Sequence, residues 1–235
     1  MTVGKKAVIV GSELVSYSAV HTLKKAKCDV VRIITDFPKH QVYMPYVPYK
    51  WWTADILERI PFSANSKVVE ILGREKVSGV VIKQEGSSKE ETIDCDVVIF
   101  SGDWIPDHEL ARLGKMDINS QTNGPLVDTE YRTSQKGVFA AGNVLRGAEP
   151  ADIAALEGKA VAHSIKQYLD SDAWIDKKQV ILSNGTIEWL VPTVIPADGK
   201  LTSDHFLFRV KEFLTNQTLT VKQGPNVIYQ KTYRR

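Results

Sequence analysis

The sequence predicts an α/β fold that begins with a parallel sheet and ends in a small all-β domain. Three observations predict it. A strand–helix–strand pattern opens the chain, and a long amphipathic helix begins after the midpoint of the sequence. Residues 178–235 then alternate β-rich runs with turns. With 235 residues, 43% hydrophobic and 25% charged, the chain has the composition of an ordinary globular protein. This length suits one complete nucleotide-binding domain plus smaller pieces.

The first element pair is the strongest part of this prediction. Residues 7–10 (AVIV) form an uninterrupted apolar run that ends at Gly11, which is typical of a buried parallel strand. Residues 14–26 place apolar side chains at helical spacing and end in lysines, which suit a helix C-terminus. A second strand is predicted at 29–35 (DVVRIIT), so the sheet is parallel with a right-handed crossover. We therefore assign residues 1–97 to a Rossmann-like nucleotide-binding domain.

The rest of this domain combines a proline-rich segment with a β-meander. Prolines in residues 37–66 forbid long helices, although 53–59 suits a short one. Strands are expected at 67–71 and 77–84, before a polar turn. Residues 96–100 (DVVIF) predict another buried strand.

The second half predicts one helix and then only strands. Residues 137–143 (GVFAAGN) are typical of a short buried strand that ends in a glycine turn. Pro150 opens a helix that runs to about Leu169, because proline suits the first helical turn. After a linker near 171–178, a sandwich or open barrel is expected. Its β-rich runs are 187–195, 206–210, 218–222 and 227–233.

Charge, hydropathy and cysteine spacing exclude several classes. A net charge of +2 does not favour a nucleic-acid partner. No apolar run approaches the roughly 18 residues that span a bilayer, so we expect no membrane partner and a cytoplasmic location. Cys28 and Cys95 lie far apart, so no dithiol redox centre is expected and both should pack as small apolar residues. The five histidines are scattered, so no metal site is predicted.

The first turn departs from a dinucleotide-binding fingerprint. That motif has glycine at the positions of Gly11, Glu13 and Ser16, and in this chain only the first of them is glycine. Ser12 lies between the first two positions. The Glu13 carboxylate falls where a pyrophosphate would lie and uses the positive end of the helix. Asp36 follows the second strand, where an acid can bind the ribose hydroxyls of NAD. Two interpretations stay open: a poor nicotinamide site, and a purely structural turn.

Motifs in the second half resemble a known family. Residues 98–110 (VIFSGDWIPDHEL) look like a strand that returns from a nicotinamide domain to a flavin domain. Residues 132–134 (RTS) and 137–145 (GVFAAGNVL) look like a second flavin motif. Residues 97–169 thus resemble FAD-dependent pyridine nucleotide-disulfide oxidoreductases. The resemblance implies that 98–172 is the C-terminal part of an FAD-binding domain, and that 178–235 is a small appended β domain.

The resemblance also implies cofactors and the residues that contact them. In that family an acid or amide after the last glycine of the second flavin motif contacts the flavin, and Asn143 matches it. The helix that begins near Asp152 points its N-terminus at the flavin ring in relatives, where its backbone amides can donate. FAD and either NAD or NADP are implied, with Asp36 leaning toward NAD. The candidates are Gly11, Ser12 and Asp36 for the nicotinamide nucleotide, and Ser101, Gly102, Asp103, Gly142, Asn143, Val144, Asp152 and Ile153 for the flavin; no catalytic residue is assigned.

The implied function is hydride transfer between a nicotinamide and a flavin. In the family, the first strand and glycine-rich loop of the flavin domain precede the nicotinamide domain, whereas this chain begins with the latter. We therefore expect an FAD site that is incomplete in this chain alone, and a homo-oligomer or partner subunit that supplies the missing segment. The chain would be a native subunit or a truncated component. The alternative is a non-catalytic binding or scaffold module that has lost its nucleotide-binding loops.

Two further groups have a plain structural explanation. His40 and His108 can titrate near neutral pH, but isolated loop histidines are more often structural. An aromatic cluster can line a pocket, but such clusters more often pack as loops on their own domain. That cluster comprises Tyr43, Tyr46, Tyr49, Trp51 and Trp52.

Overall fold

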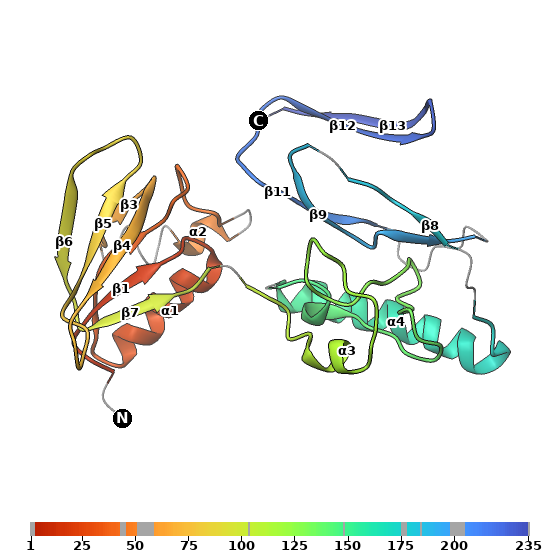
Figure 1. Cartoon of the computed structure of the whole chain (residues 1–235), viewed down its shortest axis with the longest axis horizontal. Coiled ribbons are helices and arrows are strands. Elements are labelled where there is room, and N and C mark those ends of the chain that lie inside the picture. The colour runs from red at the N-terminus through yellow and green to blue at the C-terminus, as the bar shows by residue number, and fades with distance from the viewer. Residues whose placement is uncertain are drawn as a thin grey trace. The chain divides into compact units, whose positions relative to one another are not determined.

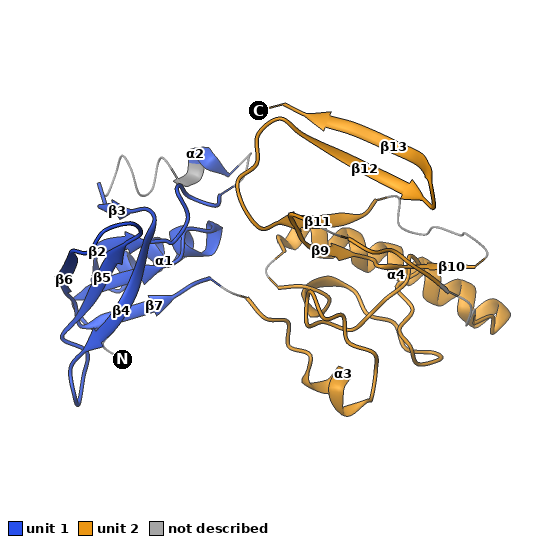
Figure 2. Ribbon diagram, turned by 45° about the horizontal axis from the view of Figure 1, so that its top comes forward, with its two compact units in different colours: residues 1–103 blue, residues 104–235 orange. Residues whose placement is uncertain are grey.

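The computed structural model divides the chain into two units. Residues 1–103 form unit 1 and residues 104–235 form unit 2 (Figure 2). The domain limits predicted at residues 97, 172 and 178 stay predictions. The structure describes residues 3–42, 46–50, 59–102, 104–147, 149–174, 178–183, 185–197 and 205–234.

Unit 1 contains the predicted parallel sheet. Its four strands lie in the order β3-β2-β1-β7, and every neighbouring pair is parallel. Helix α1 (Leu14–Lys25) connects β1 to β2 and lies along the sheet (Figure 1), which confirms the strand–helix–strand prediction. A short helix, α2 (Val47–Lys50), precedes β3. The strands are β1 (Lys6–Val10), β2 (Asp29–Ile34), β3 (Phe62–Ser63) and β7 (Val97–Phe100).

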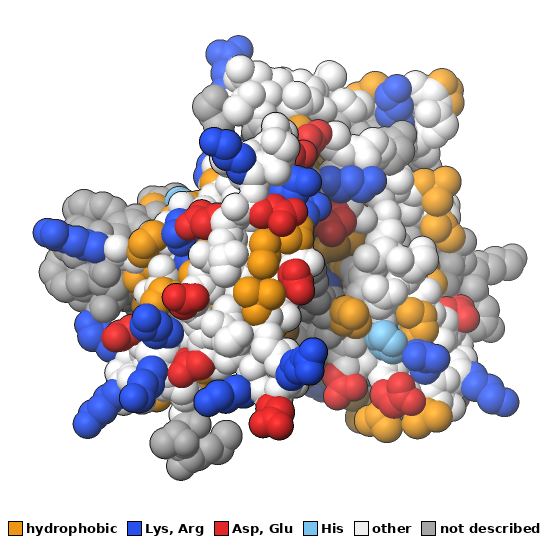
Figure 3. All heavy atoms as spheres, turned by 60° about the vertical axis from the view of Figure 1, so that its left-hand side comes forward, with side chains coloured by type: hydrophobic (Ala, Val, Ile, Leu, Met, Phe, Trp, Pro, Cys, Tyr) orange, Lys and Arg blue, Asp and Glu red, His pale blue; other side chains and the backbone are white. Residues whose placement is uncertain are grey.

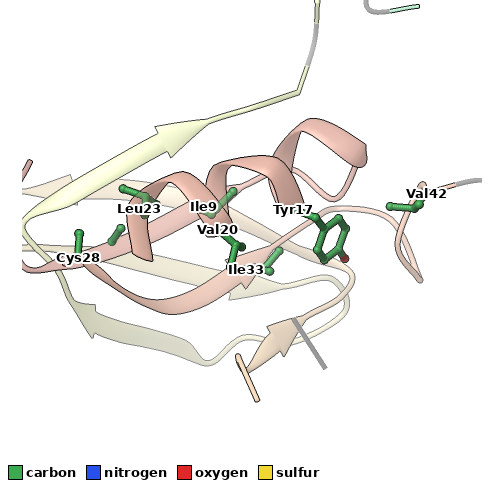
Figure 4. Close-up of a cluster of buried hydrophobic side chains, with 8 residues drawn as sticks. Ile9, Tyr17, Val20, Leu23, Cys28, Ile33 and Val42 are labelled. Carbon is green, nitrogen blue, oxygen red and sulfur yellow. The ribbon is translucent and has the colours of Figure 1, made fainter. Parts of the chain in front are cut away.

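Helix α1 covers one face of this sheet. Because successive side chains of a strand point to opposite faces, Ala7 and Ile9 of β1 face the helix. They pack with Tyr17 and Leu23 of α1 in a buried cluster (Figure 4). Cys28 belongs to the same cluster, as expected for a small apolar residue.

A β-meander covers the opposite face. Val8 of β1 and Ile34 of β2 pack against Val80 and Ile82 of the meander, in a cluster that also buries Cys95. Burial raises the pKa of both cysteine thiols, and the nearby Asp96 carboxylate adds to the shift. The antiparallel strands of the meander are β4 (Ser66–Leu72), β5 (Gly79–Gln84) and β6 (Glu90–Asp94).

Unit 2 is built around one long helix. Helix α4 (Ala151–Ser171) follows a 3-10 turn, η2 (Gly142–Val144), and a short helix, α3 (Glu109–Leu113), lies earlier in the chain. The unit's buried cluster joins Val127, Tyr131 and Leu145 to Trp189 and Val191. Three two-stranded antiparallel sheets complete it: β8 (Lys178–Val180) with β10 (Val194–Pro196), β9 (Ile187–Val191) with β11 (Leu207–Val210), and β12 (Gln217–Gln223) with β13 (Asn226–Tyr233).

Three predictions for unit 2 were wrong. The described part of 178–235 forms three separate ladders, not a sandwich or barrel. The predicted single run at 187–195 divides into β9 and β10 around Pro192, which lacks the N–H that a ladder needs. Residues 137–143 form no strand, because only Phe139 finds a bridge partner, Arg132.

Some predictions fall outside the residues that the structure describes. These are most of the helix expected at 53–59 and the aromatic residues Tyr43, Trp51 and Trp52. In the described ranges, no helix has both the length and the apolar character needed to cross a bilayer. Basic and acidic side chains are interspersed on the face shown in Figure 3, in keeping with the small net charge.

Candidate functional site

The β1–α1 turn of unit 1 is held tightly between the ends of three strands. Gly11 donates its N–H to the Ile34 carbonyl at 2.8 Å, and Ser101 donates its own to the Val10 carbonyl at 2.9 Å. Gly11 has a φ of +131°, and a Cβ at this position would lie 2.6 Å from the Ser101 Oγ. Glycine is therefore required here by conformation and by space.

Hydroxyl groups fill the interior of this turn. Ser16 Oγ and Ser101 Oγ are 2.8 Å apart and buried, so each satisfies the other. The Ser12 hydroxyl is also buried and donates to Thr35 Oγ1 at 3.1 Å. The side chains of Ser12 and Ser101 thus frame the turn. Gly102 is exposed with open space around it, and Asp103 lies outside the described residues.

Glu13 is the residue at which this turn differs most from a nucleotide-binding loop. It is the N-cap residue of α1, with extended dihedrals of −86° and 175°, and it forms a capping box with Ser16. The Ser16 hydroxyl accepts the Glu13 N–H at 3.1 Å. The carboxylate thus occupies the positive end of the helix, where an anionic ligand would otherwise bind.

Asp36 stands beyond the end of β2 with its side chain half exposed. Lys67 Nζ lies 3.9 Å from its Oδ2, and the lysine side chain is 74% exposed. An ion pair this exposed contributes little stability, so a ligand hydroxyl can replace the lysine at small cost. The Asp36 carboxylate is thus accessible beyond the end of β2, and its role as a ribose-binding acid stays a prediction.

In unit 2 a buried carboxylate organises the loop before α4. Glu157 accepts the Gly142 N–H through Oε2 at 2.8 Å and binds Arg146 Nη2 through Oε1 at 2.6 Å. The side chains of Arg146 and Glu157 are 1% and 4% exposed. Arg146 also lies 3.3 Å from a Glu149 oxygen. The Gly142 amide is therefore already used by the protein, and only the positions beside it can face a cofactor.

Asn143 and the start of α4 supply the exposed donors. Asn143 accepts the Glu149 N–H through Oδ1 at 3.1 Å, which leaves its Nδ2 group able to donate outward. Helix α4 begins after Pro150 without a side-chain cap, so its first-turn amides, including those of Asp152 and Ile153, can donate to a ligand. A Cβ on Gly142 would lie 3.9 Å from the Ala154 Cβ, so η2 packs directly against this helix end.

The structure thus gathers the predicted residues into two groups. One is at the carboxyl edge of the unit 1 sheet, and the other joins η2, with Gly142, Asn143 and Val144, to the start of α4. Arg146 and Glu157 were not singled out from the sequence. Glu157 was detectable, because it lies four residues after Ile153 and four before Val161, on the apolar stripe of the helix.

Comparisons with known proteins identify the family of this chain. The model of the family described as pyridine nucleotide-disulphide oxidoreductase matches residues 3–158. This chain belongs to that family. Its members are FAD- and NAD(P)-dependent oxidoreductases, and their fold has the parallel Rossmann-like core found in unit 1.

Individual relatives of the family cover parts of the chain. Thioredoxin reductase of Treponema pallidum is 30% identical over 109 residues, which are 46% of this chain and 34% of that protein. Dihydrolipoyl dehydrogenase of Geobacillus stearothermophilus is 28% identical over 111 residues, 47% of this chain and 24% of that protein. Among solved structures, T. acidophilum thioredoxin reductase matches 72% of this chain and 53% of its own, with a TM-score of 0.58 and 28% identity. This chain therefore spans only part of the length of these relatives.

Proposed function

We propose that this chain is a component of an FAD- and NAD(P)-dependent oxidoreductase in which hydride passes between a nicotinamide and a flavin. Family membership supports the two cofactor classes. The observation that carries the flavin assignment is the contact between η2 and the uncapped start of α4, with Asn143 exposed beside it. A bound flavin would supply the redox chemistry, because its ring accepts and returns a hydride.

The residues of unit 2 fit a flavin. Asn143 Nδ2 is a neutral donor, so it can bind a phosphate or ribityl oxygen without charge repulsion. The amides at the start of the 21-residue helix α4 carry partial positive charge, which stabilises an electron-rich ring edge. Glu157 and Arg146 hold the loop in place from within, and we assign them a positioning role.

Unit 1 fits a nicotinamide nucleotide only in part. The accessible position of Asp36 beyond β2 supports binding of ribose hydroxyls, which favours NAD over NADP. The Glu13 carboxylate, in contrast, does not fit a bound pyrophosphate, since both are anionic and both require the N-terminus of α1. We therefore assign no step of the hydride transfer to this turn.

The proposal includes a partner that covers part of unit 2. In the described part of unit 2, nine large apolar side chains are each more than half exposed, and five of them lie between residues 105 and 169. Where such side chains adjoin, the exposed apolar surface is typical of an interaction site. We propose that a second copy of the chain or another subunit covers these five. They are Ile105, Leu110, Leu113, Leu156 and Leu169.

Flavin retention tests the proposed function. The chain is incubated with FAD, alone and together with co-expressed candidate subunits, and bound flavin is read by visible absorbance after gel filtration. We expect Asn143→Ala to weaken retention about fivefold, as for the loss of one hydrogen bond. Asn226→Ala, on the exposed strand β13, is the matched control. A colourless sample and no NADH oxidation with any partner would contradict the proposal.

A further inference from the structure

The β1–α1 turn lies where sheets of this type bind dinucleotides. Strand β1 has β2 on one side and β7 on the other, so the chain order reverses beside it. In open parallel sheets, ligands bind at the carboxyl edge of such a reversal. The backbone of this turn keeps the conformation of such a site. Gly11 has the positive φ of a tight turn, and its N–H donates a hydrogen bond to the Ile34 carbonyl.

The amides of this turn are already engaged within the protein. Glu13 donates its N–H to Ser16 Oγ at 3.1 Å, and Ser16 donates its own to the Glu13 carbonyl at 3.0 Å. The Ser16 hydroxyl is fully buried and fixed by Ser101 Oγ at 2.8 Å, so it cannot turn away. A pyrophosphate at a helix N-terminus depends on amides of this kind.

The charge at the turn opposes an anionic ligand as well. Glu13 is the N-cap residue of α1 and takes part in a capping box with Ser16, so its carboxylate adds negative charge at this helix end. A dinucleotide would bring two phosphate charges to the same helix end. Repulsion between like charges at contact distance is strong near a protein surface.

We infer that Glu13 is the specificity-determining residue that keeps unit 1 from binding a dinucleotide tightly. The carboxylate stands at the helix end that a pyrophosphate would need, on a turn whose Gly11 geometry suits one. The Glu13 charge is therefore the part of the obstacle that one substitution removes, and its removal should raise affinity. This inference refines the nicotinamide side of the proposed function and is independent of the flavin side.

Calorimetric titration with ADP-ribose and with NADH tests the inference. The proteins compared are the full chain and its Glu13→Gln and Glu13→Gly variants; glycine is tolerated at an N-cap, and glutamine keeps the size of the side chain. We expect at least about tenfold tighter binding in both variants, as for removal of one charge beside a diphosphate. Glu90→Gln on β6 changes the net charge equally at an exposed position, and its affinity should match that of the unmodified chain.

Two outcomes would overturn the inference. One is an unmodified chain that binds ADP-ribose as tightly as Glu13→Gln. The other is a pair of Glu13 variants that keep the circular dichroism spectrum of the native chain and still gain no affinity. An FAD retention assay on the same samples separates the two proposals, because loss of flavin binding contradicts the proposed function and leaves the ADP-ribose result to decide the role of Glu13.

Discussion

The ion pair between Arg146 and Glu157 is a deeply buried charged contact of unit 2. Both side chains are almost fully removed from solvent, and Glu157 also holds the Gly142 amide. A buried pair of this kind adds little net stability, because desolvation opposes the attraction. Removing one partner is costly, however, because the other charge is left buried and unpaired.

We therefore expect Glu157→Ala to lower the free energy of unfolding by about 3–5 kcal/mol. Urea denaturation followed by circular dichroism measures the loss. Glu149→Ala is the matched control, because Glu149 lies 3.3 Å from the same arginine but is 16% exposed. It should cost about 1 kcal/mol or less. Equal losses in the two variants would refute the role given to Glu157.

Asp96 ties the start of the chain to the sheet of unit 1. Its Oδ1 accepts the N–H groups of Lys5 and Lys6, at 2.9 and 2.8 Å. These backbone hydrogen bonds, Lys6 first, hold the pKa of Asp96 below the ordinary value of 3.8. Since the pKa is lower in the folded chain, the contribution to stability is complete above the unfolded value and is lost as pH falls through the folded one.

Acid titration of stability tests this residue. We expect the free energy of unfolding to fall as pH drops below about 4, and part of that decrease to be absent in Asp96→Asn. Urea denaturation at several pH values between about 6 and 2 gives the comparison. Asp94→Asn, two residues earlier at the end of β6, is the control variant. If Asp96→Asn behaves like Asp94→Asn, the assignment is wrong.

At the scale of elements, α4 contains one position that can be improved. Gly158 lies inside this helix, is exposed, and has open space where a Cβ would be. Gly158→Ala should raise the free energy of unfolding by about 0.5–1 kcal/mol, because alanine loses less backbone entropy in a helix. Thermal denaturation provides the measurement. Gly124→Ala should do the opposite, since its Cβ would collide with the carbonyls of Val144 and Leu145.

Elements with strong local patterns were predictable from the sequence. The apolar run of β1 and the helical spacing of α1 and α4 correctly predicted type and position, because burial of one face imposes the period. The short strand β8 was missed, since its sequence KQV has no alternation to detect. Its pairing with β10 is a contact between distant segments, which no local pattern encodes.

The candidate sites were predictable to a similar degree. The sequence alone shows that Glu13 and Ser16 replace two glycines of the dinucleotide-binding motif, because that motif specifies the residue at each position. The partner of Ser16 was not visible: Ser101 lies 85 residues away, and only the parallel pairing of β1 with β7 brings the two hydroxyls together. The pairing of Glu157 with Arg146 likewise depends on how the loop folds back onto α4.

At the scale of the whole molecule, the exposed apolar side chains of unit 2 predict association. Light scattering after size exclusion should show a mass above that of the monomer, rising with concentration, or a complex with a co-expressed subunit. Replacing Leu110 and Leu113 of α3, both more than two thirds exposed, by glutamate should weaken it. Val69→Glu on β4 of unit 1 is the control. A well-folded monomer at every concentration, alone or with candidate subunits, would rule out the proposed partner.

The convergence of the Gly142 amide and the Arg146 guanidinium on Glu157 has a consequence for kinetics. Two chain segments are fixed to one acceptor, so the loop that presents Asn143 is already ordered before any ligand arrives. Such pre-organisation removes the entropic cost of ordering a loop during docking. Association at Asn143 should then resemble the meeting of two rigid bodies, with a single-exponential time course and no slow conformational phase.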